Sequence, residues 1–284
     1  MKNKKFNKDN RLINSQILNL FGLQAIRYLL TSFIYFVRGI IFAWKKNKYV
    51  TTLNDDGIVI INNFLKKKDL NYIKKNFNSI AKLGVKKNLV DGDTTCVNST
   101  ISIKKLKKNY ILKKIIFSNN IIEILEACER RKFKKNDFYN HKNGKNVWLD
   151  ILKRNNSKKK DSQKFLHSDT FVNTHKVWFF PDKITKIDGP LTIVKGSHKF
   201  SLYRMVLEYL NSVIFKFPTI NEKNFKLKKY KEKEFKCIVK SNSLIIANTR
   251  AFHRRGNSKI GRIRRQIHWQ IRFEPFKNLL IKSY

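Results

Sequence analysis

The first long pattern of apolar and polar positions in the chain is helical. Residues 17–44 are strongly apolar. The polar side chains in the middle of this segment recur at steps of 3, 4, 4 and 3: Gln24, Arg27, Thr31, Tyr35 and Arg38. On a helix they form one narrow stripe, and the remaining surface is apolar. Within this segment no uncharged stretch is longer than ten residues, the length of residues 28–37, against the roughly 20 that span a bilayer. The pattern predicts an amphipathic helix that lies on a membrane surface or packs on the rest of the protein.

Most of the patterns after this helix are those of β-strands. Short apolar runs and period-two alternation, bounded by Gly, Pro and Asn, predict strands at 58–61, 147–152, 177–180, 191–194, 244–248 and 266–273, and a turn followed by a strand at 91–103. Apolar side chains at helical spacing predict helices at 67–82, 121–128 and 200–215. In the second of these helices we expect Glu123 and Glu126 to face solvent.

Many short strands with helices gathered before them favour a mainly β fold with helices (α+β), built on an antiparallel double-stranded β-helix of the jelly-roll, cupin-like class. We expect residues 1–48 to form a basic leader and an amphipathic, membrane-surface helix, and residues 49–284 to form one domain with the jelly-roll core. A chain of 284 residues is long enough for one sizeable core.

Charge changes this picture only at the N-terminus. The 62 Lys and Arg residues exceed the 20 Asp and Glu residues by 42, which draws a protein toward anionic surfaces. The basic residues are scattered, and the sequence has no helix-turn-helix, zinc-finger or aromatic RNA-binding signature, so we do not expect nucleic-acid binding. Lysines on both flanks of residues 17–44, together with Trp44, suit an anionic membrane surface.

Three widely separated cysteines, Cys96, Cys128 and Cys237, predict neither a disulfide framework nor a CxxC metal site. They fit a reducing, cytoplasmic setting. The charged leader is long and no small-residue cleavage site closes the apolar segment, so we expect no cleaved signal peptide. The protein should be cytoplasmic or peripheral at a membrane.

Candidate chemistry centres on the segment 166–171, which contains His167 and Asp169. If this segment is a β-strand, the two side chains point to the same face and converge on one ion. A distant histidine, His253, completes a set of two histidines and one carboxylate. Such a set binds Fe(II) on one face and leaves the opposite positions open for a cosubstrate and oxygen, which indicates a catalytic metal.

Four segments of the chain carry a resemblance to a known family: residues 166–171, residues 176–182, the Asp-Gly-Pro-Leu-Thr run with its continuation at 188–199, and the block around His253. Together they resemble the phytanoyl-CoA dioxygenase-like family of Fe(II)/2-oxoglutarate-dependent oxygenases. The likeness covers roughly residues 50–275. It implies that His167, Asp169 and His253 hold Fe(II), that 2-oxoglutarate and O2 are cosubstrates, and that a C–H bond is hydroxylated while 2-oxoglutarate is decarboxylated to succinate.

The resemblance also implies that an arginine eleven residues after His253, here Arg264, binds the far carboxylate of 2-oxoglutarate. A guanidinium matches a carboxylate in geometry and in charge. Arg262 and Arg265 are competitors. Arg262 shares strand parity with Arg264, whereas Arg265 falls on the opposite face. By resemblance, Thr192 also lies near the cosubstrate.

Lys176 shares a strand face with Trp178. If that face is inward, Lys176 meets an anionic group of substrate or cosubstrate; otherwise it lies in solvent. His268 has the parity of Arg264 and is expected to line the pocket without binding metal.

The remaining histidines are not expected to bind metal. His198 follows a turn and is interpreted as structural, and His141 and His175 as surface or core residues. The lysine-rich run 153–164 is expected to be a solvated loop or part of the site's rim.

The main alternative to an oxygenase is a non-catalytic jelly-roll scaffold on anionic membranes. Halogenation is disfavoured because Asp169 occupies the position that a halide would need. An apolar segment beside the site makes a small or lipid-like substrate attractive.

Overall fold

The computed structural model describes residues 15–41, 47–133, 147–215 and 220–272. The predictions for residues 1–14, Trp44 and His141 lie outside the described residues. The strands are β1 (Ile58–Ile61), β2 (Val85–Asp91), β3 (Thr94–Ile101), β4 (Val147–Arg154), β5 (Thr174–Phe180), β6 (Leu191–Val194), β7 (Glu234–Lys236), β8 (Ser243–Asn248), β9 (His253–Arg255) and β10 (Ile263–Arg272). The helices are α1 (Gln16–Leu20), α2 (Leu23–Ile41), α3 (Lys48–Asp56), α4 (Lys67–Lys82), α5 (Ile103–Lys108), α6 (Tyr110–Ile116), α7 (Asn119–Glu129), α8 (Leu202–Leu210) and α9 (Lys228–Lys231), with a 3-10 turn η1 (Ser162–Lys164) and a π-helical turn η2 (Asn211–Phe215).

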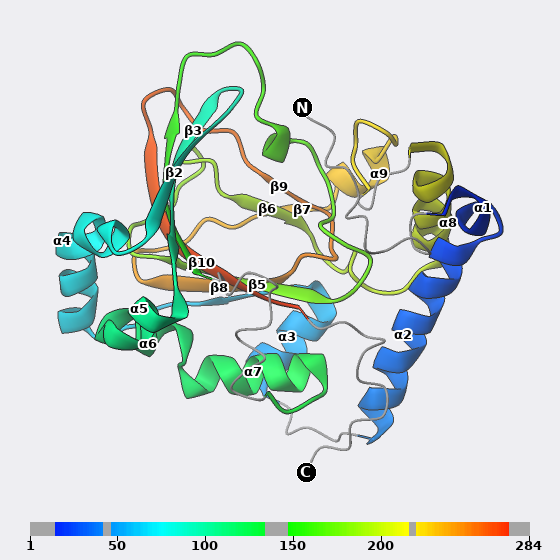
Figure 1. Cartoon of the computed structure of the whole chain (residues 1–284), viewed down its shortest axis with the longest axis horizontal. Coiled ribbons are helices and arrows are strands. Elements are labelled where there is room, and N and C mark those ends of the chain that lie inside the picture. The colour runs from blue at the N-terminus through cyan, green and yellow to red at the C-terminus, as the bar shows by residue number, and fades with distance from the viewer. Residues whose placement is uncertain (1–14, 42–46, 134–146, 216–219, 273–284) are drawn as a thin grey trace.

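Two antiparallel sheets face each other. The large sheet has the strand order β1-β8-β5-β10-β4-β3-β2, and the small sheet has the order β7-β6-β9. Helices α3 to α7 cover the outer face of the large sheet, and the small sheet lies over its inner face (Figure 1). The arrangement confirms the mixed fold with a jelly-roll core.

Strand β10 shows why the large sheet has two chemically different faces. Ile267, Trp269 and Ile271 are buried in the core shared with helices α4 to α7. The alternate residues, including Gln266 and His268, point toward the small sheet, because successive side chains in a strand take opposite faces. The period-two pattern therefore places apolar side chains against the helices and polar side chains inside the jelly roll.

Several sequence predictions are confirmed and others are wrong. Helix 67–82 and the strands at 58–61 and 191–194 have the predicted bounds. Glu126 is not exposed: its carboxylate accepts the Phe133 N–H at 2.7 Å and pairs with Lys132 at 2.9 Å. These partners follow the C-terminal end of α7 and turn the carboxylate inward.

The predicted N-terminal helix exists as α2, and its polar stripe faces the protein. Gln24, Tyr28 and Thr31 are buried, whereas Phe33 and Phe36 on the apolar side are each 60% exposed. The helix therefore packs on the protein through its polar side, and its apolar side faces outward; its location on a membrane surface stays a prediction. Among the described residues, no helix is both long and apolar enough to cross a membrane.

Candidate metal centre

His167 and Asp169 lie between η1 and β5, and His253 is the first residue of β9. The expected strand at 166–171 is not formed; His167 instead makes isolated bridges. The His167 N–H donates to the His253 carbonyl at 3.0 Å, and the His253 N–H donates back to the His167 carbonyl at 2.8 Å. The Asp169 N–H donates to the Thr249 carbonyl at 3.0 Å. Main-chain hydrogen bonds thus join the two halves of the site, which lie far apart in the sequence.

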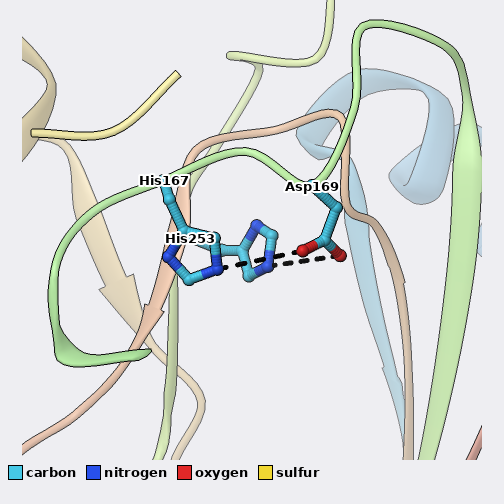
Figure 2. Close-up of side chains that lie close together, drawn as sticks. All are labelled: His167, Asp169 and His253. Atoms are coloured by element: carbon cyan, nitrogen blue, oxygen red, sulfur yellow. Dashed lines mark ion pairs between the residues drawn. The ribbon is translucent and has the colours of Figure 1, made fainter. Parts of the chain in front are cut away.

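The three side chains converge on one point (Figure 2). The Nε2 atom of His167 lies 3.8 Å from Asp169 Oδ1, and the Nε2 atom of His253 lies 3.7 Å from Asp169 Oδ2. One ligand atom from each residue can be chosen so that all lie within 4.8 Å of one another. Three donors at this separation can coordinate a single metal ion from one side.

The histidine tautomers follow from their other ring nitrogens. The Nδ1 atom of His167 lies 2.7 Å from the Phe165 carbonyl, and that of His253 lies 2.9 Å from the Ala251 carbonyl. A carbonyl only accepts, so each neutral ring carries its proton on Nδ1. Both Nε2 lone pairs are then directed toward the space beside Asp169, as metal binding requires.

Charge keeps the carboxylate ionised. Burial alone would raise the pKa of Asp169, but Lys176, His253 and His167 outweigh it and hold the pKa well below its usual range. The Lys176 ammonium lies 2.6 Å from Asp169 Oδ2, so this lysine faces inward. Burial lowers the pKa of His253 to about 4 although Asp169 opposes the shift. At neutral pH the site offers one carboxylate and an uncharged His253.

Arg264 lies near the start of β10 and is 8% exposed. It donates through Nη1 to the Gly189 carbonyl, and its Nε has no hydrogen-bond partner among the described residues. Burial first and then the neighbouring Arg255 lower the pKa of Arg264 to about 9. The Thr192 hydroxyl on β6 is fully buried and also lacks a partner in the described part of the chain. A buried guanidinium with an unused donor is suited to an anionic ligand.

The two competing arginines are occupied elsewhere. Arg262 pairs with Asp188 at 2.5 Å, and its side chain is 47% exposed. Arg265 lies on the helix-covered face, where it donates to both Asp182 oxygens at 2.8 and 3.0 Å. Strand parity placed Arg265 on the opposite face from Arg264, as the structure has it.

A buried polar network on the inner face was not anticipated. Asp150 on β4 accepts hydrogen bonds from Asn98 at 2.6 Å and from Gln266 at 2.9 Å, and pairs with His268 Nε2 at 2.8 Å. Burial would raise the Asp150 pKa, but His268 and the hydrogen bonds lower it to about 2. His268 also stacks on Trp148, with ring centroids 5.0 Å apart.

This network spans three neighbouring strands, so only the pairing register reveals it. The available signal was the position of Asp150 inside an apolar strand, where an unpaired carboxylate would be costly. His268 lines the interior as expected, and its Nδ1 is buried without a partner among the described residues.

The end of the lysine-rich run is not solvated. Lys164 is 2% exposed, and its ammonium lies 2.8 Å from both carboxylate oxygens of Asp93. Arg154 pairs with the same carboxylate at 2.5 Å. Burial and then Arg154 lower the pKa of Lys164 to about 8. The run therefore anchors the segment that leads into His167.

The other described histidines have local partners. His198 is 8% exposed, and its Nε2 lies 3.0 Å from the Asn54 carbonyl. His175 is buried, and its Nδ1 lies 2.5 Å from Glu129 Oε1. Neither belongs to the group of His167, Asp169 and His253.

Solved structures with this fold include two that are similar to the chain over most of its length. The epimerase SnoN, in complex with Fe3+, alpha ketoglutarate and nogalamycin RO, gives a TM-score of 0.50 at 13% identity, over 79% of this chain and 82% of that chain. EctD from S. alaskensis with bound Fe gives a TM-score of 0.50 at 10% identity, over 80% of this chain and 76% of that chain.

The chain shares its fold with these two proteins, one of which was solved with Fe3+ and alpha ketoglutarate and the other with Fe. No family model matches the chain, and no curated protein matches it in sequence. At these identities the similarity establishes the fold, and the chemistry has to be argued from the residues of the site.

Proposed function

We propose that the chain is an Fe(II)/2-oxoglutarate-dependent oxygenase that hydroxylates a C–H bond of a small or lipid-like metabolite. The observation that carries the proposal is the convergence of His167, Asp169 and His253 inside the jelly roll. Both histidines direct an Nε2 lone pair toward the ionised carboxylate. This donor set is the one that nonhaem Fe(II) oxygenases use, and it leaves coordination positions free.

The residues present also fit 2-oxoglutarate. Arg264 has a buried Nε without a partner in the described structure, and the buried Thr192 hydroxyl is in the same situation. A carboxylate bound to Arg264 would satisfy that donor and neutralise a buried cation. Lys176, 2.6 Å from Asp169, is close enough to the metal centre to meet a second anionic group. We assign Arg264, Thr192 and Lys176 to cosubstrate binding.

When bound, Fe(II), 2-oxoglutarate and O2 supply the oxidising power that breaks an unactivated C–H bond, with succinate and CO2 as coproducts. The protein's own residues bind, orient and shield. Asp150 fixes the proton of His268 on Nε2. The His268 ring, held in this way and stacked on Trp148, would form part of the pocket wall.

Within this class we favour the phytanoyl-CoA dioxygenase-like branch. The support is the four matching segments and the inward face of Lys176 and Trp178. A cytoplasmic enzyme that is peripheral at a membrane would have direct access to a lipid-like substrate. Asp169 in the ligand set favours hydroxylation over halogenation.

The first test is anaerobic binding of Fe(II) and 2-oxoglutarate, followed by succinate release in air. We expect a visible charge-transfer absorption and succinate from the wild type, and neither from a His167→Ala and Asp169→Ala double variant. Asp55→Ala is the matched control, because that carboxylate is 64% exposed and lies outside the group that converges on the metal centre. It should behave like the wild type.

Metal binding without consumption of 2-oxoglutarate would overturn the proposal. It would instead identify a jelly-roll scaffold with an incidental metal. Absence of both metal and 2-oxoglutarate binding would refute the assignment of His167, Asp169 and His253 as well.

A further inference from the structure

A helix that covers a core packs its apolar side on the protein, whereas α2 packs its polar side on the protein. Its polar stripe makes specific contacts with the protein: the Tyr35 hydroxyl donates to the Cys128 carbonyl at 2.6 Å, and the Arg27 guanidinium lies 4.6 Å from the centre of the Phe171 ring. Tyr28 is completely buried. The rotation of the helix is therefore fixed by polar and aromatic contacts on its inner side.

The outer side of α1 and α2 is apolar and exposed. The large side chains on it are at least 37% exposed: Ile17, Leu18, Leu20, Phe21, Ile26, Leu29, Leu30, Phe33, Phe36, Ile40 and Ile41. We call this set the α1–α2 apolar face. It amounts to on the order of 1,000 Å², whereas the largest apolar patch on a monomer is typically about 300–600 Å². Helices α1 and α2 lie at one edge of the molecule (Figure 1), and an exposed apolar surface of this size marks an interaction site.

The positive charge of this part of the chain indicates what covers the α1–α2 apolar face. No Asp or Glu lies between Asn10 and Asn54, while Lys45, Lys46 and Lys48 follow the helix closely. The whole chain carries a formal charge of +42, so two copies that met through this face would repel each other. An anionic lipid surface instead attracts the basic residues and accepts the apolar side chains. We propose that the α1–α2 apolar face docks on the surface of an anionic lipid bilayer, with the helix in the plane of the membrane.

The docked helix also contacts the metal centre's own segment. Tyr28 packs in one buried cluster with Phe171 and Val172, which follow Asp169 by two and three residues. Arg250, three residues before His253, donates to Ser32 at 3.0 Å. Membrane contact on one side of α2 therefore orients the candidate metal centre on the other side. The docking itself rests on the helix and its charges, not on the proposed oxygenase activity.

Truncation is an unsuitable test, because removing residues 1–48 would uncover Phe171 and take away the partner of Arg250. Substitution on the exposed side leaves those contacts intact. We would compare the wild type with a Phe33→Asp and Phe36→Asp double variant. A Leu89→Asp and Val90→Asp double variant is the matched control, because these β2 side chains are 51% and 73% exposed and lie far from α2 (Figure 1).

Flotation with phosphatidylcholine vesicles containing phosphatidylglycerol would be measured at low salt and at about 1 M salt, where the Debye length is about 3 Å. We expect wild type and control to remain bound at high salt, and the α2 variant to bind roughly 30-fold or more weakly. Vesicles of phosphatidylcholine alone should bind all three proteins more weakly than the anionic vesicles bind the wild type.

Three outcomes would overturn the proposal. Release of the wild type at high salt to the level of the α2 variant would mean that scattered lysines alone bind the lipid. Equal binding by the α2 variant and the control would remove the helix from the interface. A wild-type dimer in light scattering that becomes a monomer in the α2 variant would identify a second copy as the occupant. Circular dichroism verifies that each variant is folded.

Discussion

Replacing Arg264 by methionine would separate the effect of its buried charge on folding stability from its effect on 2-oxoglutarate binding. The side chain is 8% exposed, and burial lowers its pKa from 12.5 to about 9. At 1.36 kcal/mol per pKa unit, keeping it charged at neutral pH costs the folded protein on the order of a few kcal/mol. Methionine has a similar length and carries no charge. It leaves the Gly189 carbonyl without its donor, which costs about 1 kcal/mol.

The unliganded Arg264→Met variant should therefore be at least as stable as the wild type. The difference appears when 2-oxoglutarate is added. A ligand at 100 times its Kd stabilises a protein by about 2.7 kcal/mol. For a chain of this size that raises the melting temperature by roughly 5 to 10 °C. The variant should lose this rise in melting temperature, because it lacks the guanidinium that is proposed to bind the 2-oxoglutarate carboxylate.

The assay is thermal denaturation under nitrogen with Fe(II), with and without 2-oxoglutarate. Arg262→Met is the matched control: it is two residues away, paired with Asp188 and 47% exposed, and it should keep the full rise. A full 2-oxoglutarate-dependent rise in Arg264→Met would refute the assignment of this arginine. Loss of the rise in Arg262→Met would transfer the role to that residue.

Three further predictions follow from local contacts. Lys176→Met should weaken 2-oxoglutarate binding about tenfold or more by removing a charged hydrogen bond, without weakening binding of Fe(II) alone. If absorption titrations show weaker Fe(II) binding and unchanged 2-oxoglutarate binding, Lys176 is only a partner of Asp169. Gly57→Ala should destabilise the fold by about 1 to 3 kcal/mol more than Gly261→Ala. Both glycines have a φ of 78°, but only at Gly57 would the new Cβ approach another residue, the His198 Nδ1 atom at 2.5 Å. Equal urea midpoints of the two variants would contradict this. Burial lowers the pKa of His198 from 6.5 to about 4. Between these pH values the unfolded state binds more protons than the folded state, so stability is lost as the pH falls from 6.5 to 4. A His198→Gln variant should lose less stability than the wild type over this range, and identical pH profiles would contradict this.

Part of the candidate site could be selected from the sequence because its signal is local: a spacing of two residues selected His167 and Asp169 as candidate ligands. His253 is distant in the sequence, and Arg264 was selected by the family resemblance, which implies an arginine eleven residues after that histidine. The strand expected around His167 could not be predicted correctly, because its amide pairs with a residue 86 positions later. Only the folded chain shows that this segment bridges single residues and forms no continuous ladder.

Long-range partners also explain the other differences. The polar stripe of α2 was visible in the sequence, but its direction depends on Cys128 and Phe171, which lie about 100 residues or more away. The position of Asp150 inside an apolar strand indicated that its carboxylate needs partners, but not that these would be Asn98 and Gln266. The periodicity of β10, by contrast, predicted its two faces, because alternation within a strand needs no knowledge of its neighbours.

The reciprocal hydrogen bonds between His167 and His253 have a consequence for iron loading. The two imidazoles are held together by the main chain, and each ring is oriented by a carbonyl of its own segment. The ion of the proposed function would therefore meet a preorganised chelate and would not have to assemble one. Its binding energy would not be spent on ordering the polypeptide, so the proposal implies that the apoprotein folds first and acquires iron as a separate, later event.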